Sequence, residues 1–399
     1  MAELLFLAHR IPYPPDKGDK IRSWNFLRHL AARHEVHLGC FIDDPRDWQF
    51  EAPLRGICRD CCFVPLDPRS ARWRSLKGLA QRLPLTLPYY FDRRLARWVE
   101  SALARPGLAR AFAYCSAMAQ YIPPGTRQPL RRIADLVDLD SEKWLEYGRR
   151  MAGLKALIWR REGRALRRVE QQVAACFDQT LFATEAEAAL FCAAAPELSG
   201  RVHHIANGVD SDYFSPERDY PNPYPPGRTV LAFTGAMDYW PNVDAVTHFA
   251  RAILPAVKAR IPSASFAIVG AGPRPEVRAL ASGEDILVTG RVADVRPYAA
   301  HASVVVAPLR VARGIQNKVL EGMAMARPVV ASAEALEGIR LEIGSDALRA
   351  DTPADFADAI CTAASAEAAA RLGANARRRV LADFTWAASL RRLDACVDG

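Results

Sequence analysis

Short apolar runs alternate with longer amphipathic stretches along almost the whole chain. An apolar run bounded by polar turn residues is typical of a strand buried on both faces, and the stretches between the runs repeat at helical spacing. This alternation predicts parallel sheets covered by helices on both faces, the doubly wound α/β class. In the first half we expect strands at Leu4–His9, Val36–Ile42, Cys62–Leu66, Ala111–Ser116, Arg132–Val137, Gln179–Thr184 and Val202–Ala206.

A proline-rich segment separates this series of strands from a second one. Residues 219–227 read DYPNPYPPG, and four prolines in so short a span suit a stiff linker. We therefore predict a Rossmann-like domain over 1–218, a linker over 219–228, a second Rossmann-like domain over 229–384 and a closing helix over 385–399. Two such domains facing each other would form a cleft at the carboxyl ends of both sheets. The later strands are expected at Val230–Gly235, Phe266–Gly270, Ile286–Thr289, Val304–Pro308 and Val329–Ser332.

The composition is that of an ordinary globular protein, with 399 residues, 50% of them hydrophobic and 25% charged. No run approaches the roughly 20 apolar residues of a membrane span, and the amino terminus lacks the basic region of a signal peptide, which favours a cytoplasmic protein. Nine cysteines, an odd number, fit a reducing compartment. Cys58, Cys61 and Cys62 have zinc-like spacing, but no second pair lies nearby, so buried thiols are the better interpretation.

The formal net charge is +8, which a solvated basic surface, a nucleic acid, an anionic membrane or a phosphorylated ligand would each explain. Residues 69–97 mix arginines with Trp73, Leu76, Tyr89 and Tyr90, a combination that suits a membrane interface. No nucleic-acid-binding motif is present, so we expect an anionic membrane surface as partner and no nucleic acid.

The segment 307–330 is the strongest candidate for chemistry. A strand ends at Pro308, and a helix is expected to begin near Gly314 with its N–H groups aimed at a ligand, which would attract phosphate without a metal. Lys318 adds a positive charge, and Glu321 can accept hydrogen bonds from a ribose; a surface helix with a Lys–Glu pair is the alternative. Helical spacing places Gly314, Asn317, Lys318 and Glu321 on one face, and Ile315, Val319, Leu320 and Met323 on the face toward the sheet.

Two other turns of the second domain invite a ligand interpretation. In 233–242, Gly235 would let a ligand approach the backbone, and Asn242 is equally suited to capping the next helix or contacting substrate. Gly270-Ala-Gly272 follows a strand, but Pro275 stands where a dinucleotide motif has its third glycine. A tight turn is therefore preferred over NAD binding.

In the first domain, residues 12–23 form a proline-stiffened loop before a helix. Lys17, Lys20 and Arg22 could hold an anionic acceptor or a pyrophosphate, unless the loop is a plain strand-to-helix connection. Asp135, Asp138, Asp140 and Ser141 follow a strand and could present a carboxylate, although Asp140 and Ser141 suit helix capping equally well. His9 ends the first strand, where a lone histidine is more often structural than catalytic.

With these residues in view, the chain resembles the retaining glycosyltransferases of family 4, which have the GT-B architecture. The resemblance runs over most of the length and rests on four motifs in the family's order. The segments 12–23, 135–144 and 314–321 look most like the sugar transferases associated with bacterial exopolysaccharide and exosortase loci. The four motifs are Ile205–Pro216, Phe233–Asn242, Gly290-Arg291-Val292 and Gly314–Val330.

The resemblance implies roles for individual residues. Glu321 matches the second glutamate of the family's E-x7-E motif, which binds the donor ribose, whereas Arg313 replaces the first, so the donor sugar cannot be carried over. Lys318 and Arg313 would stabilise the leaving diphosphate, and Asp138 would orient the acceptor. The acceptor-binding set is Lys17, Gly18, Asp19 and Lys20. The donor-binding set is Gly235, Asn242, Arg291, Val292, Gly314, Ile315, Gln316, Asn317, Lys318 and Glu321.

The implied function is retaining transfer of a sugar from a nucleotide-sugar donor to a polyprenyl-linked saccharide, in exopolysaccharide or cell-surface glycan synthesis. No cofactor and no metal are expected, and the enzyme would be peripheral on the inner face of the cytoplasmic membrane. A nucleotide-sugar epimerase of the same fold and a non-catalytic sugar-nucleotide sensor or scaffold are the alternatives.

Overall fold

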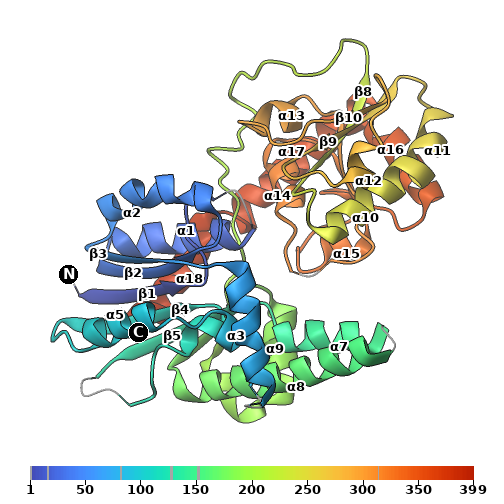
Figure 1. The fold of residues 1–399 in the computed structure, drawn as a ribbon. Coiled ribbons are helices and arrows are strands. Elements are labelled where there is room, and N and C mark those ends of the chain that lie inside the picture. Colours follow the sequence, from blue (N-terminus) through green and yellow to red (C-terminus); the bar gives the residue numbers. More distant parts are fainter. Residues whose placement is uncertain (1, 16–17, 81–82, 126–128, 151–152, 313) are drawn as a thin grey trace. The chain divides into compact units, whose positions relative to one another are not determined.

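The computed structural model describes residues 2–15, 18–80, 83–125, 129–150, 153–312 and 314–399 (Figure 1). By their contacts these residues form two compact units. The first comprises Met1–Ala206 together with Leu390–Gly399, and the second comprises Asn207–Ser389. The change of unit thus falls at Asn207, ahead of the proline-rich segment, and again within the last helix, α18 (Trp386–Asp398).

The first unit is built on a seven-stranded parallel sheet of order β3-β2-β1-β4-β5-β6-β7. Each strand predicted from an apolar run is present to within a few residues. Since β1 has β2 on one side and β4 on the other, the strand order reverses beside β1, where doubly wound sheets bind ligands. The strands are β1 (Glu3–Ala8), β2 (Glu35–Ile42), β3 (Asp60–Pro65), β4 (Leu108–Tyr114), β5 (Arg131–Val137), β6 (Gln179–Phe182) and β7 (Val202–His204).

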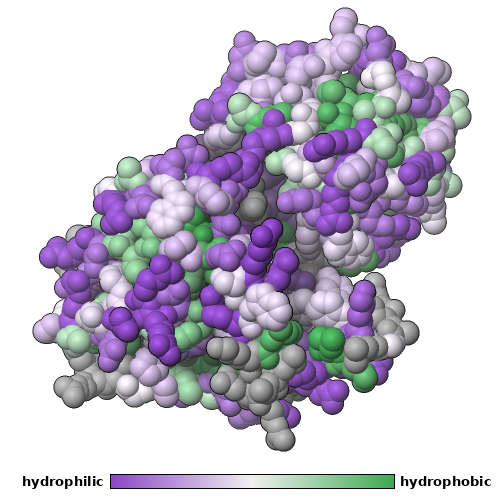
Figure 2. All heavy atoms as spheres, viewed as in Figure 1, coloured by the Kyte–Doolittle hydropathy of each residue, from purple (hydrophilic) through white to green (hydrophobic). Residues whose placement is uncertain are grey.

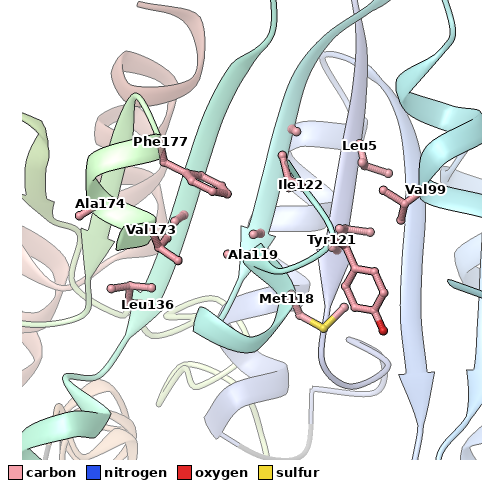
Figure 3. Close-up of a cluster of buried hydrophobic side chains, with 14 of the residues drawn as sticks. Leu5, Val99, Met118, Ala119, Tyr121, Ile122, Leu136, Val173, Ala174 and Phe177 are labelled. Carbon is pink, nitrogen blue, oxygen red and sulfur yellow. The ribbon is translucent and has the colours of Figure 1, made fainter. Parts of the chain in front are cut away.

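Helices cover this sheet, and apolar side chains fill the space between. Figure 3 shows part of this core, where Leu5 of β1, Val99 of α5, Tyr121 after α6 and Phe177 after α8 pack beside the strands. Two of the helices, α7 and α8, form a long hairpin. The helices are α1 (Gly18–Ala31), α2 (Glu51–Ile57), α3 (Pro68–Ala80), α4 (Thr86–Tyr89), α5 (Arg93–Leu103), α6 (Ser116–Ala119), α7 (Asp140–Arg150), α8 (Gly153–Cys176) and α9 (Glu185–Ala194).

The second unit has a six-stranded parallel sheet of order β10-β9-β8-β11-β12-β13. Its strand order reverses between β8 and β11, which makes the carboxyl ends of these two strands the expected ligand site. The strands are β8 (Thr229–Thr234), β9 (Ala264–Val269), β10 (Ile286–Val288), β11 (Val304–Ala307), β12 (Val329–Ala331) and the short β13 (Leu348–Arg349).

The helices of the second unit lie on both faces of its sheet, so the doubly wound fold class predicted for each half is confirmed. No helix in the described ranges is long and apolar enough to cross a membrane. The helices are α10 (Trp240–His248), α11 (Leu254–Lys258), α12 (Pro275–Arg278), α13 (Arg296–Ala300), α14 (Asn317–Ala324), α15 (Ala333–Leu336), α16 (Pro353–Ala363) and α17 (Ala366–Asp383).

Candidate active site

The turns that follow β8 and β9 bring two glycine backbones together at the strand-order reversal of the second unit. A Cβ atom on Gly270 would lie 1.8 Å from the carbonyl oxygen of Gly235, so no side chain fits there without backbone movement. The amide of Asn242 approaches the same point, 2.8 Å from where a Cβ on Gly235 would lie. A side chain on either glycine would clash with neighbouring atoms, so glycine at both positions allows the two turns and Asn242 to pack closely at this edge.

Asn242 links the β8 turn to α14. It lies inside α10, whose N-cap is Tyr239, so the prediction that Asn242 caps this helix is wrong. Its buried side chain instead donates from Nδ2 to the carbonyl of Ala236 (2.9 Å) and accepts from Nζ of Lys318 (3.3 Å). Asn242 therefore fixes the lysine relative to the turn.

Lys318 lies in the first turn of α14 and is held from three sides. Its Nζ donates to Asn242 and to Oε1 of Gln316 (3.3 Å) and lies 5.1 Å from the ring centre of Phe233. Burial lowers the pKa of Lys318 to about 8, and the nearby Glu321 partly opposes this shift. The ammonium group is consequently poorly solvated and ready to gain from an anionic partner.

Glu321 follows one turn later on α14. Burial raises the pKa of its carboxyl to about 7, and Lys318 partly offsets the increase. No ion pair joins Lys318 to Glu321 in the part of the chain that the structure describes, and both are partly buried. The alternative of a solvated helix with a surface Lys–Glu pair therefore does not describe this site, and two neighbouring groups with shifted pKa values are typical of a functional site.

The loop before α14 corrects one prediction. The helix begins at Asn317, with Gln316 as its extended N-cap, and not near Gly314, which has a φ of 68°. A residue with a left-handed backbone does not fit inside a right-handed α-helix, so Gly314 and the following Ile315 belong to the loop before α14. The Oδ1 of Asn317 is buried and has no hydrogen-bond partner within the described residues, while Arg313 lies outside them.

The remaining predicted donor residues follow β10. Thr289 donates to the carbonyl of Gly290 (2.8 Å) and accepts from the backbone N–H of Gly270 (3.3 Å), which ties the ends of β9 and β10 together. Arg291 is exposed and Val292 is partly buried, both on this carboxyl edge of the sheet. Contacts thus connect the Gly235 turn, Asn242, Gln316 and Lys318. Arg291 and Val292 lie along the same edge of the sheet.

A cavity of about 320 Å³ also opens in the second unit, lined by residues such as Leu309, Ser332 and Phe356. None of the predicted donor residues lines it. Its arginines are paired internally, Arg310 with Asp244 and Arg349 with Asp351. The candidate donor site is therefore separate from this cavity.

In the first unit, the predicted acceptor loop uses its charges internally. Lys20 is buried and forms an ion pair with Asp47 (2.7 Å), and the fully buried Arg22 contacts both carboxylate oxygens of Asp135. A buried charge without a partner is costly, and these partners come from segments distant in sequence. The expectation that Lys20 and Arg22 face a ligand is therefore wrong; Lys17 lies outside the described residues, and Gly18 begins α1.

Asp19 belongs to a charged cluster that the sequence did not suggest. Its carboxylate accepts from Arg10 (2.6 Å) and lies 3.3 Å from Nε2 of His9, which stacks on Tyr114. Burial opposes protonation of the imidazole, but the Cys115 sulfur and the Asp19 carboxylate outweigh it and raise the pKa of His9 to about 10. His9, Arg10 and Asp19 all follow β1, and the pairing of β1 with β4 adds Tyr114 and Cys115 to the cluster.

Asp138 lies just beyond β5, as predicted. Burial and the neighbouring Asp140 raise the pKa of its carboxyl, against the charges of Lys143 and Arg22. The prediction that Ser141 caps α7 is wrong, since its Oγ is buried without a partner and its backbone N–H is bound by Glu170 instead. Among the residues with described placement, no group of three or more His, Cys, Asp or Glu could hold a metal ion.

Comparison with known proteins agrees with this architecture. Residues 228–366 match the family model for glycosyl transferases group 1. No curated protein sequence matches the chain significantly. The matched segment contains β8, α10 and α14, and therefore includes the residues around Lys318.

Solved structures similar to the whole chain share its two-unit fold. HepE of Anabaena in complex with UDP-glucose is 14% identical, with 99% of both chains covered and a TM-score of 0.66. Sucrose-phosphate synthase from Thermosynechococcus elongatus is 18% identical, with 99% of this chain and 98% of that chain covered and a TM-score of 0.71. WaaG, a glycosyltransferase of lipopolysaccharide biosynthesis, is 14% identical, with 99% and 100% covered and a TM-score of 0.67.

The chain is a glycosyltransferase with the GT-B architecture.

Proposed function

We propose that this glycosyltransferase moves a hexose from a nucleotide-sugar, with retention of configuration, onto a polyprenyl-linked saccharide acceptor. The observation that carries the proposal is the arrangement of Lys318 and Glu321 on α14, beside Gly235 and Asn242 at the strand-order reversal. The UDP-glucose bound to HepE supports testing UDP-hexoses first.

In the proposed reaction the second unit binds the donor. Glu321 accepts hydrogen bonds from the ribose hydroxyls, while Lys318 and the N–H groups of the first turn of α14 contact the diphosphate. The bond from the sugar C1 to the diphosphate oxygen breaks, and its electron pair stays on that oxygen, where Lys318 stabilises the charge. Arg313, which the structure does not describe, is proposed as a second cation there.

The acceptor hydroxyl then bonds to C1 from the face that the diphosphate leaves. Its proton passes to the departing phosphate oxygen, so no protein base is required, and direct attack on this face requires no protein nucleophile. In the first unit, Asp138 is proposed to orient this hydroxyl by accepting its hydrogen bond. Gly18 and Asp19 at the start of α1 lie on the same carboxyl edge of the sheet and are proposed acceptor contacts.

Metal independence is part of the proposal. Lys318 and the helix-end amides supply the positive charge that a divalent cation would otherwise bring. The Asp138-Leu139-Asp140 triplet belongs to the first unit, and Asp140 lies 3.6 Å from the ammonium of Lys143. Turnover should therefore persist in EDTA; loss of turnover that manganese restores would contradict this.

We further propose a peripheral position on the cytoplasmic face of the membrane, where a polyprenyl-linked acceptor would be found. Trp73 is 74% exposed and Leu76 is 51% exposed on α3, next to the exposed Arg69 and Arg72. Trp73 is the most exposed of the large hydrophobic side chains in the described structure, and hydrophilic and hydrophobic residues are mixed on the face drawn in Figure 2. Aromatic and basic side chains together suit a lipid headgroup region.

Calorimetry with UDP-, GDP- and dTDP-hexoses tests the donor, and transfer to octyl glycosides and to polyprenyl-diphosphate saccharides tests the acceptor. We expect one nucleotide class to bind clearly better and the product to keep the anomeric configuration of the donor. Epimerisation of the donor without acceptor would identify an epimerase instead. Binding without turnover on any acceptor would favour a sensor.

A further inference from the structure

The loop that presents Asp138 is held by carboxylates from two other helices. Glu187 of α9 accepts from the backbone N–H of Leu139 (3.0 Å), the residue directly after Asp138. Glu170 of α8 accepts from the backbone N–H of Ser141 (3.0 Å). Both glutamates are buried, with 8% and 1% of their surface exposed, so water does not compete for these two amides.

The chain is strained where it enters this loop. Val137 has a φ of 68°, a left-handed conformation that a β-branched residue rarely adopts. Its N–H donates to Oδ1 of Asp135 (3.2 Å), and its carbonyl accepts from the N–H of Ala183 (2.7 Å). Asp135 is in turn fixed by the buried Arg22 (2.7 Å). Strain of this kind persists only where the surroundings impose it, and it concentrates at functional sites.

Burying each glutamate costs free energy, because an ionisable side chain is removed from water. A neutral side chain could bind the same backbone N–H without this cost. Serine, threonine and asparagine can bind free backbone N–H groups at a helix start without burying an ionisable group. One oxygen of Glu187 accepts from Oγ1 of Thr184 (3.0 Å), whereas Oε2 of Glu170 is buried without a hydrogen-bond partner in the described structure. Burial and the nearby Asp140 raise the pKa of Glu170 to about 7, while Ser141 and Arg167 act against this increase.

We propose that Glu170 and Glu187 are positioning residues, which hold the strained loop so that the Asp138 carboxylate points at the acceptor hydroxyl. The inference rests on the acceptor-orienting role proposed for Asp138. Neither glutamate touches the reactants; each acts through the backbone on one side of the loop. Removing either one should leave the donor site of the second unit unaffected.

Amide hydrogen exchange in the full-length protein tests the positioning without any substrate. Glu170→Ala should accelerate exchange at Ser141, and Glu187→Ala should accelerate exchange at Leu139. Glu162→Ala is the matched control, because Glu162 is also on α8, is 2% exposed and accepts from the backbone N–H of Leu85 (2.7 Å). The control should free Leu85 and leave the Asp138 loop protected.

Transfer kinetics with octyl glucoside as acceptor test the consequence. We expect Glu170→Ala and Glu187→Ala to raise the acceptor KM and lower kcat, together by about tenfold or more, with nucleotide affinity unchanged. Glu170→Gln keeps an acceptor oxygen for Ser141 and should restore both constants, but it removes the charge beside Asp140 and so should shift the pH profile.

Unchanged exchange at Leu139 and Ser141 would overturn the proposal, as would an acceptor KM in Glu162→Ala raised as much as in the other two variants. If the wild-type protein transfers no sugar, the proposed function fails by itself. In that case amide hydrogen exchange and the carboxyl pKa of Asp138, measured by carbon NMR, still test the positioning role of the two glutamates. That pKa should move in Glu170→Ala and stay in Glu162→Ala; the same value in all three proteins would refute the positioning.

Discussion

At the scale of single residues, the proposed donor site contains a partly buried lysine and a partly buried carboxylic acid, both with shifted pKa values. Neither Lys318 nor Glu321 has a full complement of polar partners in the described structure, although each carries a group that water would normally solvate. A ligand that supplies a diphosphate and hydroxyls would satisfy both.

Glu321→Ala should weaken nucleotide binding by about 1.5–3 kcal/mol, the range for a hydrogen bond to a charged group. Calorimetry with the free nucleoside diphosphate measures this directly. Glu334→Ala, an exposed glutamate of the same unit, is the control and should bind as the wild type does. If Glu321→Ala binds the nucleotide as tightly as the wild type, Glu321 does not contact the donor.

Nucleotide affinity should also depend on pH through Lys318. The free protein loses the lysine proton as pH rises through about 8, so the cation that attracts the diphosphate disappears above that value. Affinity should then fall with increasing pH, by at most about tenfold per pH unit for one linked proton. Lys318→Arg, which stays charged over this range, should flatten the dependence in calorimetry between roughly pH 7 and 10. An equally steep fall in this variant would assign the titration to another group.

At the scale of elements, the carboxyl edges of the two sheets are built differently. In the second unit the turns after β8 and β9 pack closely through glycines, and α14 carries Lys318 and Glu321. In the first unit, two non-glycine residues have left-handed backbones: Cys115 directly follows β4, and Val137 is the last residue of β5. Strained turns at adjacent strand ends are consistent with a ligand-binding edge there as well.

Gly270→Ala tests the close contact between the β8 and β9 turns of the second unit. The new Cβ would lie 1.8 Å from the carbonyl oxygen of Gly235, so the β8 and β9 turns must separate. We expect a loss of at least about 1–3 kcal/mol in urea unfolding, together with weaker nucleotide binding. Gly56→Ala in α2 has nothing within 4 Å of its added methyl and should be neutral or slightly stabilising. Equal stability of the two variants would show that the glycine contact is not required.

These elements also show what the sequence could predict. Apolar runs located the strands well because buried parallel strands are continuously hydrophobic, whereas the two-residue β13 left no such pattern. Helical spacing correctly predicted that Val319, Leu320 and Met323 of α14 are buried, whereas Ile315, assigned to the same face, lies in the loop before the helix. The start of α14 was predicted wrongly, because a glycine such as Gly314 can either begin a helix or lie in the loop before it.

Charged residues were the main source of error. Lys20 and Arg22 were expected to face a ligand, but their partners Asp47 and Asp135 follow other elements, and a single sequence does not reveal such pairs. The same limitation hid the place of Tyr114 and Cys115 beside His9 and the glutamates that bind the Asp138 loop. Local pattern thus predicts elements, while side-chain partners depend on the order of strands in the sheet.

At the scale of the whole molecule, the excess of positive charge bears on where the enzyme works. The formal net charge is +8, and a soluble nucleotide-sugar does not require it. Many arginines are paired: Arg94 binds Asp92, and Arg74 donates to the backbone carbonyl of Tyr89. Arg69 and Arg72 on α3 remain exposed beside Trp73, which makes α3 the best candidate for the membrane contact.

Liposome co-sedimentation should show binding to vesicles with anionic lipids and little binding to neutral ones. Each basic residue near an anionic surface contributes about 1 kcal/mol, so the double variant Arg69→Glu/Arg72→Glu should lower partitioning by well over tenfold. Trp73→Ala should weaken binding at any salt concentration, because it removes apolar contact rather than charge. High salt should weaken binding of the wild type, since screening shortens to about 3 Å at 1 M.

The control for net charge is Arg251→Glu/Arg278→Glu, which changes two exposed arginines of the second unit by the same amount. If α3 is the docking element, this variant should bind vesicles nearly as well as the wild type. If both double variants lose binding equally, the attraction comes from overall charge and not from α3. Equal partitioning of the wild type onto neutral and anionic vesicles would refute electrostatic docking altogether, because a headgroup contact through arginine requires lipid charge.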